Sequence, residues 1–285
     1  MKRILIIFLV LIGCYLLLTS NIMNLFLFGK NNSEIQLTKR IDTIEVDVSS
    51  AQVNMIPEDR DNIRAELSGK GKVSMDKDGD TIKIDYKRGF FSGLQFFNQT
   101  PKLNIYIPSD YSKSLELKIG SGYLAFEGPS DDEPISLDSL SIDMSSGKVD
   151  LKNIKAKEFE HEGSSGLADI DTLTAESASV RMSSGKAKIK DLKGKLDAKI
   201  SSGLLDIQLS ELTDPVELQA SSGQIKLDLP DDADFMLNGK SSSGFIECDL
   251  PLRDKISEKG KIKGTSGTGK HPIDVQVSSG HVKIY

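Results

Sequence analysis

The residues most able to do chemistry in this sequence are serines that recur in the tripeptide Ser-Ser-Gly. A serine acts as a nucleophile only when a base activates it and an oxyanion site stabilises the developing charge. The chain repeats near-identical serines many times and has only His161, His271 and His281 to serve them as bases. No Gly-x-Ser-x-Gly elbow stands between a strand and a helix. We therefore expect structural turns, no catalytic residue and no enzymatic activity.

Acidic and histidine side chains could also hold a metal ion. Glu160, His161 and Glu162 are neighbours, but alternation along a strand turns both glutamates away from the histidine. His161 falls at an inward position, so we expect an interior or rim histidine. Other acids lack the Gly-Gly-x-Gly-x-Asp spacing of calcium-binding solenoids. We expect no metal and no cofactor, and solvated turn carboxylates at Asp169, Asp171, Asp231, Asp232 and Asp234.

The Ser-Ser-Gly copies recur at intervals of roughly 19 to 21 residues over most of the chain after residue 115, a period typical of a solenoid. Glycine at the end of each copy would permit a left-handed or closely packed backbone. The serine hydroxyls could satisfy amides exposed where the strand turns. The predicted turn glycines are Gly122 (in a Gly-Ser-Gly variant), Gly147, Gly166, Gly185, Gly203, Gly223, Gly244 and Gly280.

Apolar residues alternate with polar ones on both sides of each turn, as in strands with one buried face. Leu196, Ala198 and Ile200 precede one turn, and Leu205 and Ile207 follow it. We therefore predict an all-β fold, a single-stranded parallel β-helix or β-solenoid, in which each rung is two short strands joined at Ser-Ser-Gly. A β-sandwich is the alternative, but it predicts Asn-Gly or Asp-Gly hairpin turns rather than one tripeptide at one spacing.

The amino-terminal segment is apolar from residue 4 to residue 28 apart from a few interruptions, and Lys2 and Arg3 precede it. A helix that crosses a bilayer needs roughly 20 mostly apolar residues, and flanking positive charge favours the cytoplasmic side. In a second reading, Cys14 is the lipidated residue of a lipoprotein signal. We predict a cytoplasmic tip (1–3), a transmembrane anchor (4–28), a linker (29–40), an N-terminal cap with the first rungs (41–114) and the Ser-Ser-Gly solenoid (115–285).

Two stretches depart from the repeat. The loop between Arg88 and Gln99 is richer in large apolar residues than a turn requires, so we expect either packing over the first rung or contact with a partner or membrane. The stretch from Arg253 to His271 is rich in lysine and glycine, and we expect an exposed insertion there. The candidate contact residues of the loop are Phe90, Phe91, Leu94, Phe96 and Phe97.

Charge excludes one class of partner. After residue 30 the chain carries 33 basic and 42 acidic residues, a net charge of −9. Such a surface repels nucleic acid and gains little from releasing its counterions. One locally basic region could face anionic wall polymer or lipid, although a solvated strand face explains it as well. Its lysines are Lys148, Lys186, Lys188, Lys190, Lys193 and Lys195.

Three motifs carry a family resemblance. They are Ile-Pro-Ser-Asp-Tyr at 107–111, Leu-Pro-Asp-Asp-Ala-Asp-Phe at 229–235, and the terminal run from Gly-Thr-Gly-Lys to Val-Ser-Ser-Gly-His-Val-Lys-Ile at 267–284. With the repeated turns, they make residues 40–285 similar to the bacterial "putative adhesin" family of β-solenoid domains. The resemblance implies an envelope location and no known enzymatic activity. Because one membrane-anchored member is encoded beside a cell-envelope stress system of Firmicutes, it also suggests a stress-response context.

The sequence thus predicts a single-pass membrane protein with its C-terminal domain outside the cytoplasm, acting as an adhesin-like binding or scaffold module. Its expected partners are the membrane, through the anchor, and an envelope protein or wall polymer. One alternative is an extracytoplasmic enzyme that acts on wall or lipid substrate, and another is a purely structural spacer.

Overall fold

The computed structural model of the chain describes residues 31–87, 100–130 and 133–285, and this part holds twenty β-strands and no helix. The all-β solenoid prediction is confirmed, whereas the predicted transmembrane helix lies outside the described residues. The strands are β1 (Asn31–Gln36), β2 (Thr43–Glu58), β3 (Asn62–Ser68), β4 (Lys72–Asp78), β5 (Thr81–Lys87), β6 (Lys102–Pro108), β7 (Ser114–Glu127), β8 (Ile135–Met144), β9 (Lys148–Gly163), β10 (Leu167–Met182), β11 (Lys186–Ile200), β12 (Leu204–Leu209), β13 (Val216–Ala220), β14 (Gln224–Asp228), β15 (Phe235–Ser241), β16 (Phe245–Cys248), β17 (Arg253–Glu258), β18 (Lys261–Ser266), β19 (His271–Val277) and β20 (His281–Ile284).

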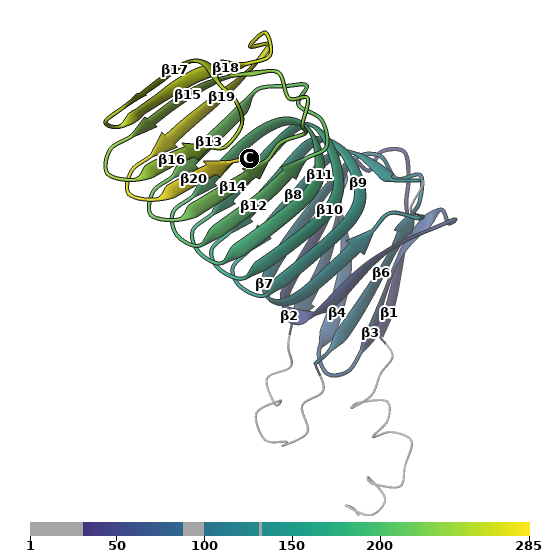
Figure 1. Cartoon of the computed structure of the whole chain (residues 1–285). Coiled ribbons are helices and arrows are strands. Elements are labelled where there is room, and N and C mark those ends of the chain that lie inside the picture. Colours follow the sequence, from purple (N-terminus) through teal and green to yellow (C-terminus); the bar gives the residue numbers. More distant parts are fainter. Residues whose placement is uncertain (1–30, 88–99, 131–132) are drawn as a thin grey trace, which may run out of the picture.

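Each central rung has three sides rather than the expected two (Figure 1). The first side precedes a Ser-Ser-Gly turn and the second side follows it. A short third side leads on to the first side of the next rung. In β9 these are residues 158–163 for the first side, 148–152 for the second and 154–156 for the third, and each pairs in parallel with its equivalent in β10.

The Ser-Ser-Gly turns stack directly on one another. The backbone amides of each turn donate hydrogen bonds to backbone carbonyls of the neighbouring rung, so the parallel ladder continues through the turn. For example, Ser165 N donates to Ser145 O at 3.0 Å, and Leu167 N donates to Gly147 O at 2.9 Å. The expectation that serine hydroxyls satisfy these amides is wrong. Where the hydroxyls bond, they donate to carbonyls, as Ser184 Oγ does to Ser164 O at 3.2 Å.

A second corner, absent from the predicted rung, separates the second side from the third. Asn153, Thr172 and Asp191 occupy it in successive rungs with φ values of 56°, 58° and 49°. Asparagine and aspartate tolerate this left-handed region better than most residues, whereas a β-branched threonine does so rarely. The corner explains why the apolar alternation skips one position here.

The core is a set of side-chain columns that run along the stack, because parallel register places equivalent residues above one another. One column on the first side contains Leu117, Ile142, His161, Val180 and Ala198. All but His161 are apolar, and each is at most 1 % exposed. The alternation seen in the sequence therefore describes one continuous core.

The N-terminal end of the stack is closed by antiparallel strands. The outermost rung is β5 with β6, and β2 lies between it and β7. Strand β4 then pairs antiparallel with β5, and β3 with β6, while β1 covers β3. Residues 31–36 are therefore part of the cap, although the sequence suggested a linker there.

The C-terminal end has a rung order that differs from the chain order. Strands β19 and β20 lie between the rung of β13 and β14 and the rung of β15 and β16. The segment predicted as an exposed insertion forms the hairpin of β17 and β18, in which every residue of β17 is exposed, and β18 pairs antiparallel with β15. It covers an edge that would otherwise be open to pairing with another chain.

Candidate functional site: a groove on the third side

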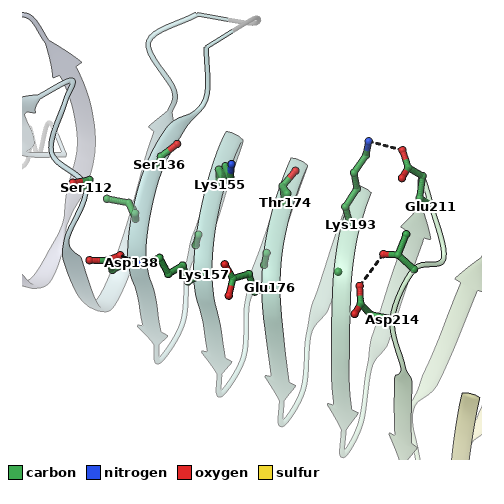
Figure 2. A pocket seen from close by; sticks show the side chains of 15 residues that line it. Ser112, Ser136, Asp138, Lys155, Lys157, Thr174, Glu176, Lys193, Glu211 and Asp214 are labelled. Carbon is green, nitrogen blue, oxygen red and sulfur yellow. Dashed lines mark hydrogen bonds and ion pairs between the residues drawn. The ribbon is translucent and has the colours of Figure 1, made fainter. Parts of the chain in front are cut away.

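A groove of about 560 Å³ runs across the third sides of successive rungs. One edge carries Ser136, Lys155, Thr174 and Lys193, which come from four neighbouring strands (Figure 2). Asp138, Lys157 and Glu176 form the opposite edge. Successive rungs therefore contribute one residue to each edge of the groove, and the repeat of these two positions suits an extended ligand.

Small side chains make the floor. Ala156 and Ala175 stack below Leu137, and each of the three is at most 4 % exposed. In the next rung the position belongs to Gly194, where a Cβ would lie 1.6 Å from the carbonyl oxygen of Ala175. Because large apolar residues would fill this space, the groove depends on small ones in register.

Loops close the two ends of the groove. Ser112, in the connection before β7, contributes at one end. At the other end, residues 210–215 between β12 and β13 take the place of the third side and contribute Glu211, Thr213 and Asp214. The groove is thus bounded at both ends by elements of the fold.

The walls carry charges of both signs. Lys157 Nζ lies 2.6 Å from Asp138 Oδ1, and Lys193 Nζ lies 2.7 Å from Glu211 Oε1. The hydrogen bond to Asp138 raises the pKa of Lys157 above its usual value. Exposed pairs of this kind contribute little stability, so they remain available to exchange partners with a ligand.

The lining of the groove combines hydroxyl groups, charged groups and an apolar floor. Its hydroxyls come from Ser112, Ser136, Thr174 and Thr213, and no histidine or cysteine lines it. The hydroxyl of Thr213 donates to its neighbour Asp214 at 2.8 Å. An apolar floor between hydroxyl-bearing and charged walls can hold an extended chain, and it offers no nucleophile beside a histidine base.

The predicted turn glycines occupy one edge of the stack. Gly122, Gly147, Gly166, Gly185 and Gly203 have φ values between 94° and 133°. The remaining three, Gly223, Gly244 and Gly280, have no left-handed φ. At two of them close packing applies instead, since a Cβ would meet a neighbouring carbonyl oxygen at 2.2 Å (Gly244) or 2.3 Å (Gly280).

The candidate contact loop with Phe90, Phe91, Leu94, Phe96 and Phe97 lies outside the described residues. Its flanking strands are placed: β5 ends at Lys87 and β6 begins at Lys102 in the outermost N-terminal rung. The parallel register aligns Val48 with Tyr86 and Gln52 with Lys102, on the two sides of the Ser-Ser-Ala turn of β2.

His161 is fully buried between Ile142 and Val180. Neither ring nitrogen has a hydrogen-bond partner in the described part of the chain. Burial lowers the pKa of His161 to about 4, and the negative charge of Asp143 and the nearby backbone of Ile142 oppose this shift. His161 is thus a neutral core residue near pH 7, and its burial keeps it from the solvent-accessible position that a catalytic base needs.

Asp234 holds a turn together. Its carboxylate accepts hydrogen bonds from the backbone N–H groups of Thr268, Gly269 and Lys270 and from the Thr268 hydroxyl, at 2.6–3.0 Å. These bonds, the one from Lys270 foremost, lower the pKa of Asp234 to about 2. Across residues 31–87, 100–130 and 133–285, no three His, Cys, Asp or Glu side chains cluster so as to hold a metal ion.

Several lysines of the predicted basic region lie beside acids. Lys148 Nζ lies 2.7 Å from Asp150 Oδ1, and Lys193 belongs to the groove. On the second side, Lys188 stands between Asp169 and Asp206 on the neighbouring strands. These positions describe a strand face with mixed charge.

Sequence reasoning missed the groove because it divided each rung into two strands. The relevant sign was present: apolar residues two apart are followed by a step of three at Leu151 to Ile154 and again at Ala156 to Phe159. Each step of three marks a corner, and the residues between the two corners form the third side.

No described helix is long and apolar enough to span a bilayer, and the predicted anchor at 4–28 lies outside the described residues. The membrane anchor and the fate of Cys14 therefore remain predictions.

Comparison with known proteins places the fold. A search of curated proteins finds no match. A "putative adhesin" from Bacteroides fragilis is 13% identical with a TM-score of 0.50, covering 90% of this chain and 98% of its own. A "putative lipid binding protein" from Parabacteroides distasonis is 17% identical with a TM-score of 0.50, covering 91% and 98%. At these identities the likeness shows a shared fold. The Toastrack DUF4097 profile matches residues 41–285, and the chain belongs to this family.

Proposed function

We propose that this protein is a membrane-anchored, extracytoplasmic module of the cell envelope that binds or scaffolds an extended partner and has no enzymatic activity. The third-side groove carries the proposal, because it repeats one pair of wall positions over successive rungs. The naming of one structural relative as an adhesin and another as lipid-binding agrees with a binding role. The short anchor and the chain length also resemble LiaG, the family member beside a Firmicutes envelope-stress system, so we propose that stress context here.

The groove is tested by site-specific photo-crosslinking in intact cells. A crosslinking amino acid at Thr174, in the groove, should capture an envelope protein or wall polymer. The same amino acid at Lys188, on the second side, is the control. Equal products from both positions, or none from Thr174, would rule out the groove as the binding site.

Topology is tested separately. A reporter fused after Tyr285 should be active only outside the cytoplasm, because Lys2 and Arg3 precede the apolar run. Labelling with palmitate that is lost in Cys14→Ala would replace the uncleaved anchor by a lipoprotein anchor. A reporter active in the cytoplasm would contradict both.

The phenylalanine loop offers a second candidate contact surface. If it packs over the first rung, Phe96→Ser with Phe97→Ser should lower the melting temperature sharply, since a buried phenylalanine contributes roughly 1.5 to 3 kcal/mol. If it is a contact site, the double variant should melt almost unchanged and lose partner or membrane association. A variant that changes neither property would remove the loop from both roles.

A further inference from the structure

A second groove of about 370 Å³ lies along the Ser-Ser-Gly edge near the C-terminal end, away from the third side. It crosses four rungs, and parallel register places Lys199, Gln219, Gln276 and Lys240 in one column along it. Serines of successive turns form its other border. The full lining is Lys199, Gln219, Ala220, Ser221, Lys240, Ser241, Ser242, Gln276, Val277 and Ser278.

This lining contains no carboxylate, although acids outnumber bases by nine after residue 30. Lys199 and Lys240 are both exposed, and neither is in an ion pair within the described residues. The column continues beyond Lys240 to Lys261, directly opposite it on β18, and Lys261 in turn lies opposite Glu258 on β17. Like charges opposite one another on paired strands are destabilising, which points to an anionic ligand that offsets them.

The surroundings increase the positive charge at this end. Residues 253–270, which include the hairpin of β17 and β18, carry six basic and two acidic residues. Toward the N-terminus the positive charge of this edge is balanced, because the adjoining groove contains Asp143 and Glu162 beside Arg181 and shares Lys199. An anion is therefore attracted more strongly to the C-terminal groove, which has no carboxylate, than to the adjoining groove.

The neutral polar groups of the groove suit a hydrogen-bonding ligand. The hydroxyls of Ser221, Ser242 and Ser278 and the amides of Gln219 and Gln276 make no side-chain hydrogen bond within the described residues. Each can donate to phosphate oxygens or to hydroxyls of a ligand. The lysines add charge at both ends of this row.

The spacing favours a chain over a single ion. Three rung spacings separate Lys199 from Lys240, roughly 14 Å at the usual strand separation. One phosphate cannot contact both lysines, whereas successive phosphates of a polymer can. The next column on the same side is acidic, with Asp197, Glu217 and Asp274 in register. A broad anionic surface such as a bilayer or a nucleic-acid duplex would meet these acids, and a single narrow chain along the edge would avoid them.

We propose that this groove binds a linear phosphodiester polymer with hydroxyl-bearing repeats, laid along the Ser-Ser-Gly edge from Lys199 toward Lys261. The proposal deepens the envelope-binding role proposed above by naming a ligand class, and it rests on that role. The lysines would contact successive phosphates, and the serine and glutamine side chains would bond to the oxygens between them.

The test uses the full-length protein in non-ionic detergent and a fluorescent poly(glycerol phosphate) oligomer, with binding followed by anisotropy. The wild type should bind at low salt and lose affinity as salt is added. Lys199→Gln with Lys240→Gln should weaken binding by about tenfold or more, because two charge contacts are removed. Lys186→Gln with Lys188→Gln is the matched control: it removes two lysines from the second side of the same strand, β11, and should leave binding unchanged.

Further arms identify the ligand source. Inorganic phosphate should compete only at far higher concentration than the oligomer, since one ion cannot use both lysines. Equal weakening by the two double variants, equal competition by inorganic phosphate, or binding only to mixed micelles that contain phosphatidylglycerol would each overturn the proposal. Thermal melts check that the variants are folded. Failure here leaves the cross-linking result at Thr174 and the topology result unaffected, so the two proposals fail separately.

Discussion

The middle of the stack and its C-terminal end use the same tripeptide in different ways. In the middle, Gly147, Gly166 and Gly185 are 19 residues apart, have left-handed φ, and follow one another in space as in the chain. At the end, the turn of Gly280 lies between those of Gly223 and Gly244. A repeated Ser-Ser-Gly thus marks where a rung turns, and it does not determine which rung is the neighbour.

The difference has a physical basis in how each region is bounded. A central rung has a parallel partner on both sides, so the shortest connection to the next rung suffices. At the last rungs one strand edge has no following rung to pair with, and an uncovered edge can pair with another chain. Strand β15, on the first side of the last rung, pairs with β19 on one edge and with β18 on the other. The first side therefore has no open edge at β15.

The largest expected effect is at a central glycine. Gly185→Val should destabilise the fold by about 3 kcal/mol, because φ is 95° and a Cβ would lie 2.2 Å from Gly166 O. Gly223→Ala is the comparison at the end, where φ is not left-handed and the nearest atoms to a Cβ are 3.1 Å away. Ser183→Ala tests the hydroxyl. Thermal melts that show equal losses at Gly185 and Gly223 would remove the distinction between the two regions.

The second prediction concerns the buried histidine of the middle region. His161 has a folded pKa of about 4 against an ordinary value of 6.5, so the unfolded chain binds more protons between these values. Stability should fall as pH drops from 6.5 to 4 and should level off below. His161→Ile, which extends the column of Ile142, should remove this loss, worth about 3 kcal/mol at pH 4.

His161→Gln separates the two causes, because it cannot titrate here but keeps a buried polar group. It should abolish the pH dependence, whereas only His161→Ile, which leaves no buried polar group without a partner, should also raise the stability at pH 7. Chemical denaturation between pH 4 and pH 7 measures both variants. A pH profile identical to the wild type in His161→Ile would show that other groups cause the acid sensitivity.

The third prediction concerns the turn that leads into β19 at the C-terminal end. Asp234→Asn should lower the melting temperature, since the ionised carboxylate binds three backbone amides and one hydroxyl. With its folded pKa lowered to about 2 from 3.8, this stabilisation is complete above pH 3.8 and is lost as pH falls through 2. Asp232→Asn, an exposed neighbour, is the control. Equal melting of the two variants would show that the turn does not depend on Asp234.

Sequence reasoning reached the class of fold and the positions of the turns because both follow from local periodicity. Alternation with a period of two fixes which residues face inward, and the alternating residues around Gly203 are buried as expected. The permuted order at the C-terminal end could not be predicted in the same way, because every rung presents nearly the same hydrophobic pattern to any other. Pairing there depends on which edge strand needs covering. The groove floor of Ala156, Ala175 and Gly194 was readable only after the third side was recognised.

The smallest expected effect is at the second corner, which is regular in the middle of the stack and loses a residue when the chain passes from β11 to β12. Thr172 has φ of 58° there, whereas its neighbours in the column are Asn153 and Asp191. A β-branched side chain is strained in this region, so Thr172→Asn should stabilise the protein by about 0.5 to 1 kcal/mol. The reverse change, Asp191→Thr, should destabilise it by a similar amount. Both positions are exposed, so packing changes little and the backbone preference is isolated.

A rise in melting temperature for Thr172→Asn with a fall for Asp191→Thr would show that the middle rungs owe part of their regularity to this corner. Changes of the same sign in both variants would instead attribute the effect to the surface, and the corner would follow passively from the Ser-Ser-Gly ladder.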